Sequence, residues 1–182
     1  YQTLLIADEV LTGFGRTGRM FACEHAAVRP DLICLSKALT AGYLPMSVTA
    51  ATEPIYEAFL SEDRGKTFFH GHSFTANPLA CAVALASLDL FRENAVLDRI
   101  QALERQLRAG LEPLRRLPGV GDVRVIGGVG AVELESTSPD YLDRAGPRMA
   151  AAFLERGILL RPLGNILYFM PPYVITEPEV SW

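Results

Sequence analysis

A lysine and a pair of acids each follow an apolar run in this chain. Lys37 comes soon after the apolar residues 32–35, and Asp8 and Glu9 come directly after residues 4–7. Short apolar runs with polar boundaries predict buried strands. Ligands of open α/β sheets bind beyond the carboxyl ends of the strands. We therefore expect the amine and a carboxylate to converge on one pocket.

An amine and a carboxylate placed in this way suit pyridoxal phosphate (PLP). That cofactor needs a lysine for its Schiff base and a carboxylate beside its ring nitrogen. Asp8 would favour the protonated ring, and Lys37 would hold the cofactor and move the substrate proton. The alternative is that neither residue is catalytic: Lys37 would be a solvated lysine, and Asp8 an acid at the start of a loop. The glycine-rich residues 13–18, GFGRTG, lie between the two motifs and favour the site.

Residues 4–42 carry a longer pattern, LLIADEVLTGFGRTGRMFACEHAAVRPDLICLSKALTAG. This pattern resembles the cofactor signature of the class III (omega-amino) aminotransferases. Residues 69–82 resemble the second phosphate-binding segment of that family, and residues 161–173 resemble its substrate-carboxylate segment. The resemblance implies catalytic roles for Lys37 and Asp8, PLP as cofactor, and the α/β fold of the type I PLP-dependent transferases.

Within this class, the chain is most similar to the aminotransferases of biotin synthesis. Their reaction moves the amino group of S-adenosylmethionine to 8-amino-7-oxononanoate. Residues 21–26, FACEHA, add to the likeness. Lysine is the alternative amino donor, and class members acting on ornithine, 4-aminobutyrate or β-alanine are the alternative enzymes. A truncated, non-catalytic dimerisation scaffold is a further alternative, but it would not need Asp8 and Lys37.

The resemblance also assigns residues that would bind the cofactor. Ser73 would donate its hydroxyl to a phosphate oxygen, reaching the cofactor of a neighbouring subunit, so a homodimer is expected. A turn-capping role is the alternative for Ser73, and Thr75 is the fallback hydroxyl. Val10 would pack on the ring face or within the core.

Arg161 is expected to bind the substrate carboxylate, since its planar guanidinium makes a bidentate contact. A surface position is the alternative for this arginine. Three weaker candidates complete the expected substrate pocket: Gly71, Tyr168 and Arg16.

The composition gives no reason to expect a nucleic-acid or membrane partner. The formal net charge is −4, the sequence pI is about 5.4, and no apolar run approaches the length of a membrane span. Three cysteines without CxxC spacing predict free thiols in a reducing cytoplasm. His70 and His72 lack a third ligand at usable spacing, so no metal site is expected.

Two domains are expected. Residues 1–93 would be part of a large PLP-binding domain with a mostly parallel sheet, and residues 94–182 a small α+β domain truncated at its end. The chain starts inside strand-like sequence and stops where Thr176 signals a helix start, as a fragment would. The family's first phosphate loop and ring-stacking aromatic would precede it.

The expected elements follow from periodicity and from capping residues. In the first domain these are strands at 4–7, 32–35 and 47–51, a helix at 53–60, a loop at 65–76, and a helix from Asn77 to about residue 91. In the second domain, leucines and an isoleucine at helical spacing from 97 to 114 predict an amphipathic helix. Strands at 122–126, 131–135, 158–160 and 166–170 and a helix at 141–156 complete it. A tight turn, not a nucleotide loop, is expected at glycines 127, 128 and 130.

Overall fold

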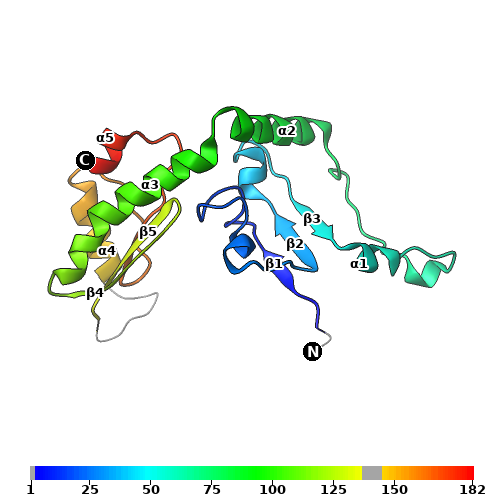
Figure 1. The fold of residues 1–182 in the computed structure, drawn as a ribbon, viewed down its shortest axis with the longest axis horizontal. Coiled ribbons are helices and arrows are strands. Elements are labelled where there is room, and N and C mark those ends of the chain that lie inside the picture. The colour runs from blue at the N-terminus through cyan, green and yellow to red at the C-terminus, as the bar shows by residue number, and fades with distance from the viewer. Residues whose placement is uncertain (1–2, 137–144) are drawn as a thin grey trace. The chain divides into compact units, whose positions relative to one another are not determined.

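A computed structural model describes residues 3–136 and 145–182 of the chain (Figure 1). The residues form two compact units, Tyr1–Val96 and Leu97–Trp182. The domain boundary predicted near residue 94 falls between helices α2 (Pro78–Glu93) and α3 (Val96–Leu111). No helix in the described part of the chain has both the length and the apolar character to cross a membrane.

A three-stranded sheet carries the first unit. Strand β1 (Ile6–Asp8) pairs in parallel with β2 (Leu32–Leu35), and β2 pairs antiparallel with β3 (Val48–Ala51). The sheet order β1-β2-β3 places β2 in the middle (Figure 1). All three strands lie within or overlap the apolar runs that predicted them.

Two details of this sheet differ from the buried strands of a mostly parallel sheet that were expected. The third strand runs antiparallel, because residues 36–47 turn back without the crossover that a parallel connection needs. The strands are not all buried, since Ile6 is 60% exposed and every residue of β3 is exposed. Helix α2 packs on the 3-10 helix η2 (Lys37–Thr40), and its Ala84 belongs to a buried cluster that Leu35 of β2 also contacts.

The helix predicted from Asn77 onward is confirmed as α2. The Asn77 side chain accepts hydrogen bonds from the Leu79 and Ala80 amides at 3.1 Å each, and Pro78 occupies the first helical position. Helix α1 (Glu53–Glu57) ends earlier than the predicted residue 60. Two short 3-10 helices complete the unit, η1 (Ala22–Ala26) and η3 (Arg64–Lys66).

The buried core of the first unit lies beside the sheet. Phe14 from the glycine-rich loop, Leu39 from η2 and Ala84 from α2 form one buried cluster. Partly buried apolar side chains pack against it: Met20, Leu35, Ala38, Met46, Leu88 and Phe91. This packing fixes the loop and the start of η2, the two segments that follow β1 and β2.

The second unit is built on an antiparallel sheet. Strands β4 (Val120–Ile126), β5 (Val129–Leu134) and β6 (Ile166–Phe169) pair in that order. The predicted tight turn between the first two is confirmed: Ile126 pairs with Val129, and Gly127 has a φ of +52°. Glycine adopts that backbone without steric cost.

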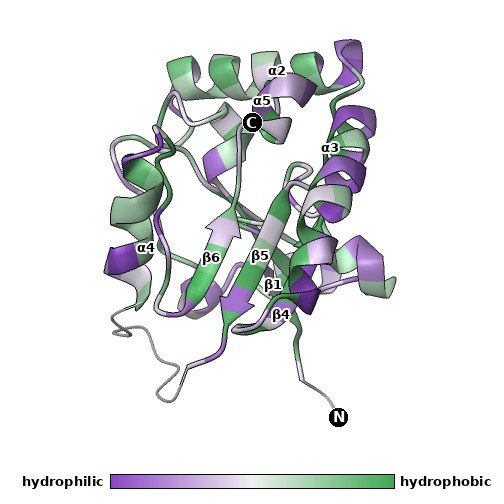
Figure 2. Cartoon of the chain, turned by 90° about the vertical axis from the view of Figure 1, so that its left-hand side faces the viewer, coloured by the Kyte–Doolittle hydropathy of each residue, from purple (hydrophilic) through white to green (hydrophobic). Residues whose placement is uncertain are grey.

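The apolar face predicted for α3 is confirmed. Its buried residues are Ile100, Leu103, Leu107 and Leu111. Leu111 joins Val123, Val132 and Leu167 from the three strands in one buried cluster. Hydrophobic residues lie along β5 and β6 in Figure 2. Gly130 leaves room for the cluster, because a Cβ there would lie 2.5 Å from Leu111 Cδ1.

The 3-10 helix η4 (Glu112–Arg116) directly follows α3. The strand predicted at residues 158–160 is wrong. Leu160 packs on the buried cluster, but its backbone joins no ladder, and the nearest pairing is an isolated bridge between Leu163 and Ile166. Of the helix predicted over 141–156, the structure has α4 (Ala145–Leu154), and residues 141–144 lie outside the described residues. The predicted helix start at Thr176 is confirmed by α5 (Glu177–Ser181).

Candidate functional site

The ends of β1 and β2 bring the acid and the lysine to one edge of the first sheet. The two strands are parallel, and Asp8 pairs in register with Cys34, three residues before Lys37. Carboxyl ends of parallel neighbours lie at the same sheet edge. The predicted convergence of the two strand ends is therefore present within this unit.

Lys37 lies at the first position of η2, in a backbone conformation that is uncommon for its residue type. Its φ is +39°, and a positive φ outside glycine is a feature of constrained sites. Neighbouring contacts hold it there. Ser36 donates its hydroxyl to the Met46 carbonyl oxygen at 2.7 Å, and the Gly42 amide donates to the Lys37 carbonyl oxygen at 3.2 Å. The Lys37 side chain is exposed and has no ion-pair partner among the described residues.

The Asp8 carboxylate is also exposed. Its Oδ1 accepts a hydrogen bond from the Val10 amide at 3.1 Å, which orients the carboxyl group without neutralising it. Val10 itself is half-buried. The carboxylate and the amine are therefore both available to a ligand at this edge.

Glu9, which the sequence interpretation left without a role, is the most heavily bonded acid of the first unit. It is 3% exposed, and its carboxylate accepts from the Thr12 hydroxyl at 2.5 Å and from the Ala22 and Cys23 amides at 2.9 and 2.7 Å. Burial alone would raise the pKa of Glu9, but these hydrogen bonds together lower it below its ordinary value. In the sequence, Glu9 directly follows Asp8 at the end of a predicted strand. Successive strand residues point to opposite sides, so Glu9 could have been expected to point away from Asp8.

The glycine-rich loop folds back on the end of β1. The Gly13 amide donates to the Glu9 carbonyl oxygen at 2.9 Å, and a Cβ on Gly13 would lie 2.8 Å from that oxygen, so only glycine fits. The His25 Nε2 lies 2.8 Å from the Thr17 carbonyl oxygen. Arg16, expected at the pocket rim, is half-buried within this loop.

The segment expected to bind phosphate is exposed throughout. Ser73 and Gly71 are both exposed, and nothing lies within 4 Å of a Cβ built on Gly71. Thr75, the fallback hydroxyl, accepts a hydrogen bond from the His72 amide at 3.1 Å and so closes a turn. The turn-capping role considered for Ser73 therefore belongs to Thr75, which leaves the Ser73 hydroxyl without a partner among the described residues.

Two of the expected substrate residues belong to the second unit. Tyr168 lies in β6, half-buried and paired with Ala131. Arg161 is exposed and pairs with no acid in the described part of the chain, whereas Arg115 and Arg124 form ion pairs with Asp122. An unpaired guanidinium retains its full capacity to bind a carboxylate.

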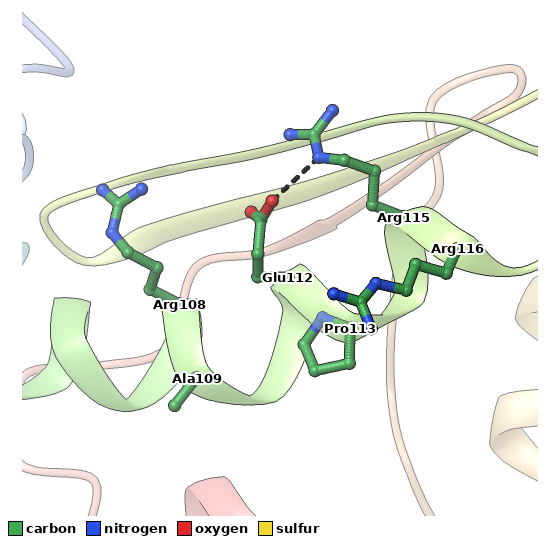
Figure 3. A pocket seen from close by; sticks show the side chains of 6 residues that line it. All are labelled: Arg108, Ala109, Glu112, Pro113, Arg115 and Arg116. Atoms are coloured by element: carbon green, nitrogen blue, oxygen red, sulfur yellow. Dashed lines mark hydrogen bonds and ion pairs between the residues drawn. The ribbon is translucent and has the colours of Figure 1, made fainter.

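Two hollows in the second unit contain none of the predicted site residues. One, of about 430 Å³, is lined by six residues: Arg108, Ala109, Glu112, Pro113, Arg115 and Arg116 (Figure 3). Two of its three arginines form ion pairs: Arg108 pairs with Glu104, and Arg115 pairs with Glu112. The other, of about 710 Å³, lies between α3 and residues 173–177. No group of three potential metal ligands occurs within residues 3–136 and 145–182.

All 182 residues match the family model of the class III aminotransferases. The chain belongs to this family. Class III aminotransferases use pyridoxal phosphate. Lys37 and Asp8, the lysine and the acid at the sheet edge, therefore belong to a family that binds this cofactor. The resemblance inferred from residues 4–42 is confirmed.

Relatives of known name are similar over almost the whole chain. The adenosylmethionine-8-amino-7-oxononanoate aminotransferase of Synechococcus elongatus is 53% identical over 179 residues, which cover 98% of this chain and 42% of the relative. The enzyme of the same name from Geobacter sulfurreducens is 48% identical over 188 residues, covering 100% of this chain and 42% of the relative. The chain thus spans about two fifths of the length of these relatives.

Solved structures agree with the observed fold. The enzyme of the same name from Methanocaldococcus jannaschii superposes with a TM-score of 0.89 at 42% identity, covering 98% of this chain and 43% of that one. An omega transaminase from Pseudomonas jessenii, solved in complex with PMP, gives 0.91 at 34% identity and covers 100% and 41%. The predicted α/β fold of the type I PLP-dependent transferases is confirmed.

Proposed function

We propose that this chain is the part of a PLP-dependent aminotransferase that contains the cofactor lysine. The whole enzyme would transfer the amino group of S-adenosylmethionine to 8-amino-7-oxononanoate, giving 7,8-diaminononanoate in biotin synthesis. The observation that carries this proposal is the parallel β1–β2 pairing, which brings Asp8 and Lys37 to one sheet edge. The names of the relatives from Synechococcus elongatus and Geobacter sulfurreducens support the choice of substrates.

The residues present fit the cofactor. PLP requires a free amine and a carboxylate, and Lys37 and Asp8 are exposed and without ion-pair partners among the described residues. When bound, the cofactor supplies a sink for the electrons released as the substrate loses its α-proton. Ser73, whose hydroxyl is exposed, would donate to a phosphate oxygen.

The chain's own residues would then perform three tasks. The Lys37 amine would hold the cofactor and afterwards accept and return the substrate proton. The Asp8 carboxylate would keep the ring nitrogen protonated, and its orientation is held by the Val10 amide. Val10 would pack against one face of the ring. Each role is expected from the family motif and agrees with the exposure observed.

The substrate side rests on a different set of residues. The acceptor carries a carboxylate at the far end of an apolar chain, so its site needs a cation and an apolar surface. The exposed, unpaired Arg161 would supply the cation, and Tyr168, Gly71 and Arg16 would contribute to the walls.

We also propose that the enzyme is a cytoplasmic homodimer. The exposed segment from His70 to Asn77 would be donated to the partner subunit, where Ser73 reaches the phosphate. All three cysteines are unpaired, in keeping with a reducing compartment. Mixing inactive Lys37→Ala and Ser73→Ala subunits should restore activity, because a hybrid dimer would contain one intact site. No recovery despite demonstrated subunit exchange would contradict the shared site.

The substrates are tested by a transamination assay on the purified enzyme. S-Adenosylmethionine should support conversion of 8-amino-7-oxononanoate, with lysine tested in parallel as the donor. The biotin assignment fails if neither donor works while 4-aminobutyrate or ornithine converts bound PLP to pyridoxamine phosphate. In that case, the class III assignment still stands.

Arg161→Lys separates the two substrates in the same assay. The lysine keeps the charge but loses the bidentate geometry, so KM for the acceptor should rise about 10-fold or more while KM for the donor changes little. Arg156→Lys is the matched control, because Arg156 is an exposed arginine of the same unit that binds the Ala152 carbonyl oxygen. Equal effects on donor and acceptor would rule out the proposed role of Arg161.

A further inference from the structure

Glu9 is a buried carboxylate that the proposed chemistry leaves without a task. It follows Asp8 directly, yet Asp8 is exposed and Glu9 is 3% exposed, as expected for successive residues leaving a strand on opposite sides. Burying a carboxylate is costly unless hydrogen bonds compensate. The burial of the Glu9 carboxylate at the end of β1 therefore requires an explanation.

Its contacts connect three segments of the first unit. The carboxylate accepts from the first two amides of η1, those of Ala22 and Cys23, which have no partner within their own helix. It also accepts from the hydroxyl of Thr12 in the loop. The Glu9 amide donates to the Cys34 carbonyl oxygen at 3.0 Å, which joins the same residue to the end of β2.

These contacts fix the backbone on both sides of the candidate site. Asp8 precedes Glu9, and Cys34 lies three residues before Lys37 and pairs with Asp8. A displacement of Glu9 therefore changes the position of the Asp8 carboxylate relative to Lys37. The loop is itself tied to Glu9, because the Gly13 amide donates to the Glu9 carbonyl oxygen.

We propose that Glu9 is a positioning residue that joins η1, the glycine-rich loop and β2, and thereby holds Asp8 in place against the cofactor ring. This inference rests on the proposed function. Glu9 itself would contact neither substrate nor cofactor. Its effect on the reaction passes through Asp8 alone.

The test is Glu9→Gln in the holoenzyme, with Glu24→Gln as the matched control. Glutamine keeps the shape of Glu9 but turns an NH₂ group toward one of the two η1 amides, where two donors would face each other. Glu24 is exposed and accepts a single bond, from the Phe21 amide at 3.2 Å, which a glutamine oxygen can still accept.

Three measurements are needed. In Glu9→Gln, kcat should fall about 10- to 100-fold with little change in substrate KM. The pH midpoint of the bound cofactor's visible absorption change should shift by about half a unit or more, since Asp8 sets the ring charge. The Cys23 thiol should be alkylated about 3-fold faster or more, because burial and the neighbouring Glu9 carboxylate raise its pKa in the wild type.

The outcomes separate this inference from the proposed function. If the wild-type protein does not attach PLP to Lys37, the proposed function fails, and Cys23 alkylation without cofactor still reports whether Glu9 holds η1. If wild type and Glu9→Gln share the same absorption midpoint and kcat, the inference is overturned while the function stands. If Glu9→Gln does not fold, Thr12→Val removes one donor only and should shift the midpoint in the same direction by less; an unshifted midpoint overturns the inference.

Discussion

The two units differ in how completely they cover their sheets. In the second, Leu111 from α3 packs with one residue from each of three strands in a buried cluster, and nine-tenths or more of each side chain is removed from solvent. In the first, Ile6 of β1 is 60% exposed and β3 has no buried residue. Asp8 and Lys37 belong to the unit whose strands are less covered.

Charged groups show the same contrast. In the second unit, Asp122 pairs with Arg115 and Arg124, and Arg124 also pairs with Glu133. In the first unit, Arg92 and Asp89 form an ion pair on the surface of α2, whereas Asp8 and Lys37 belong to no ion pair among the described residues. Paired charges stabilise a fold but are unavailable to a ligand. The first unit therefore retains charges that a ligand can use, whereas in the second unit Arg108, Arg115 and Arg124 are engaged in ion pairs.

The largest effect of any change in the less covered unit is expected from the removal of the Lys37 amine. Lys37→Ala should abolish covalent attachment of PLP and lower kcat about 10⁴-fold or more, because both cofactor anchorage and proton transfer depend on the amine. Borohydride reduction of the wild-type holoenzyme followed by peptide mapping should label Lys37. Lys66→Ala, at an exposed lysine of the same unit, is the control. Label on any lysine other than Lys37 would contradict the site.

The next largest effect is expected at the acid. Asp8→Asn should leave PLP bound but slow removal of the substrate α-proton about 10²- to 10³-fold, since a neutral ring accepts electrons poorly. Single-turnover kinetics of the half-reaction would measure this rate. Asp31→Asn is a useful contrast, because Asp31 accepts the Leu5 amide at the other end of the sheet. An unchanged rate in Asp8→Asn would mean that a different acid partners the ring nitrogen.

A third change tests the self-contained core of the second unit. Leu167→Ala should destabilise it by about 2–4 kcal/mol, through lost burial and a residual cavity. Leu159→Ala, at a residue that is 86% exposed, should cost less than about 0.5 kcal/mol. Hydrogen exchange of the β5 amides would measure both. Similar exchange rates in the two variants would show that the cluster does not support the sheet.

Much of this structure could be predicted from local sequence. Asn77 and Thr176 mark helix starts through bonds confined to a few residues: the Asn77 side chain accepts first-turn amides, and the Glu179 carboxylate accepts from the amide and the hydroxyl of Thr176. The leucine spacing of α3 predicted its buried face, because that pattern also depends only on residues within one helix. The acid and the lysine were identified because each follows an apolar strand of predictable length.

The remaining features depend on partners that local sequence does not specify. Residues 158–160 have the composition of a strand, but Leu160 packs by its side chain without joining a ladder. Strand β3 runs antiparallel because of the path taken by residues 36–47. The burial of Glu9 depends on amides of Ala22 and Cys23, thirteen and fourteen residues away. Pairings of this kind become visible only in the fold.

The smallest expected effect concerns the acid dependence of the second unit. Hydrogen bonds from Arg115 and then Arg124 hold the pKa of Asp122 below its ordinary value of 3.8. A carboxyl with a lowered pKa in the folded state contributes stability that is present above its unfolded pKa and lost as the pH falls through the folded value. The stability contributed by Asp122 should therefore be present at pH 7 and decrease below about pH 4.

Asp122→Asn should remove that contribution without affecting the first unit. At pH 7 the variant should unfold at a slightly lower urea concentration than wild type, and the difference should shrink as the pH falls below about 4, because the unfolded wild-type chain then takes up a proton on Asp122 more readily than the folded one. The effect should be modest, since the ion pairs are at the surface and screened by salt. Glu155→Gln, at an exposed glutamate without an ion pair among the described residues, should show no such convergence. A difference between Asp122→Asn and wild type that stays constant from pH 7 to pH 3 would mean that Asp122 stabilises the sheet through its shape, by the hydrogen bond that it accepts from the Val123 amide, and not through its charge.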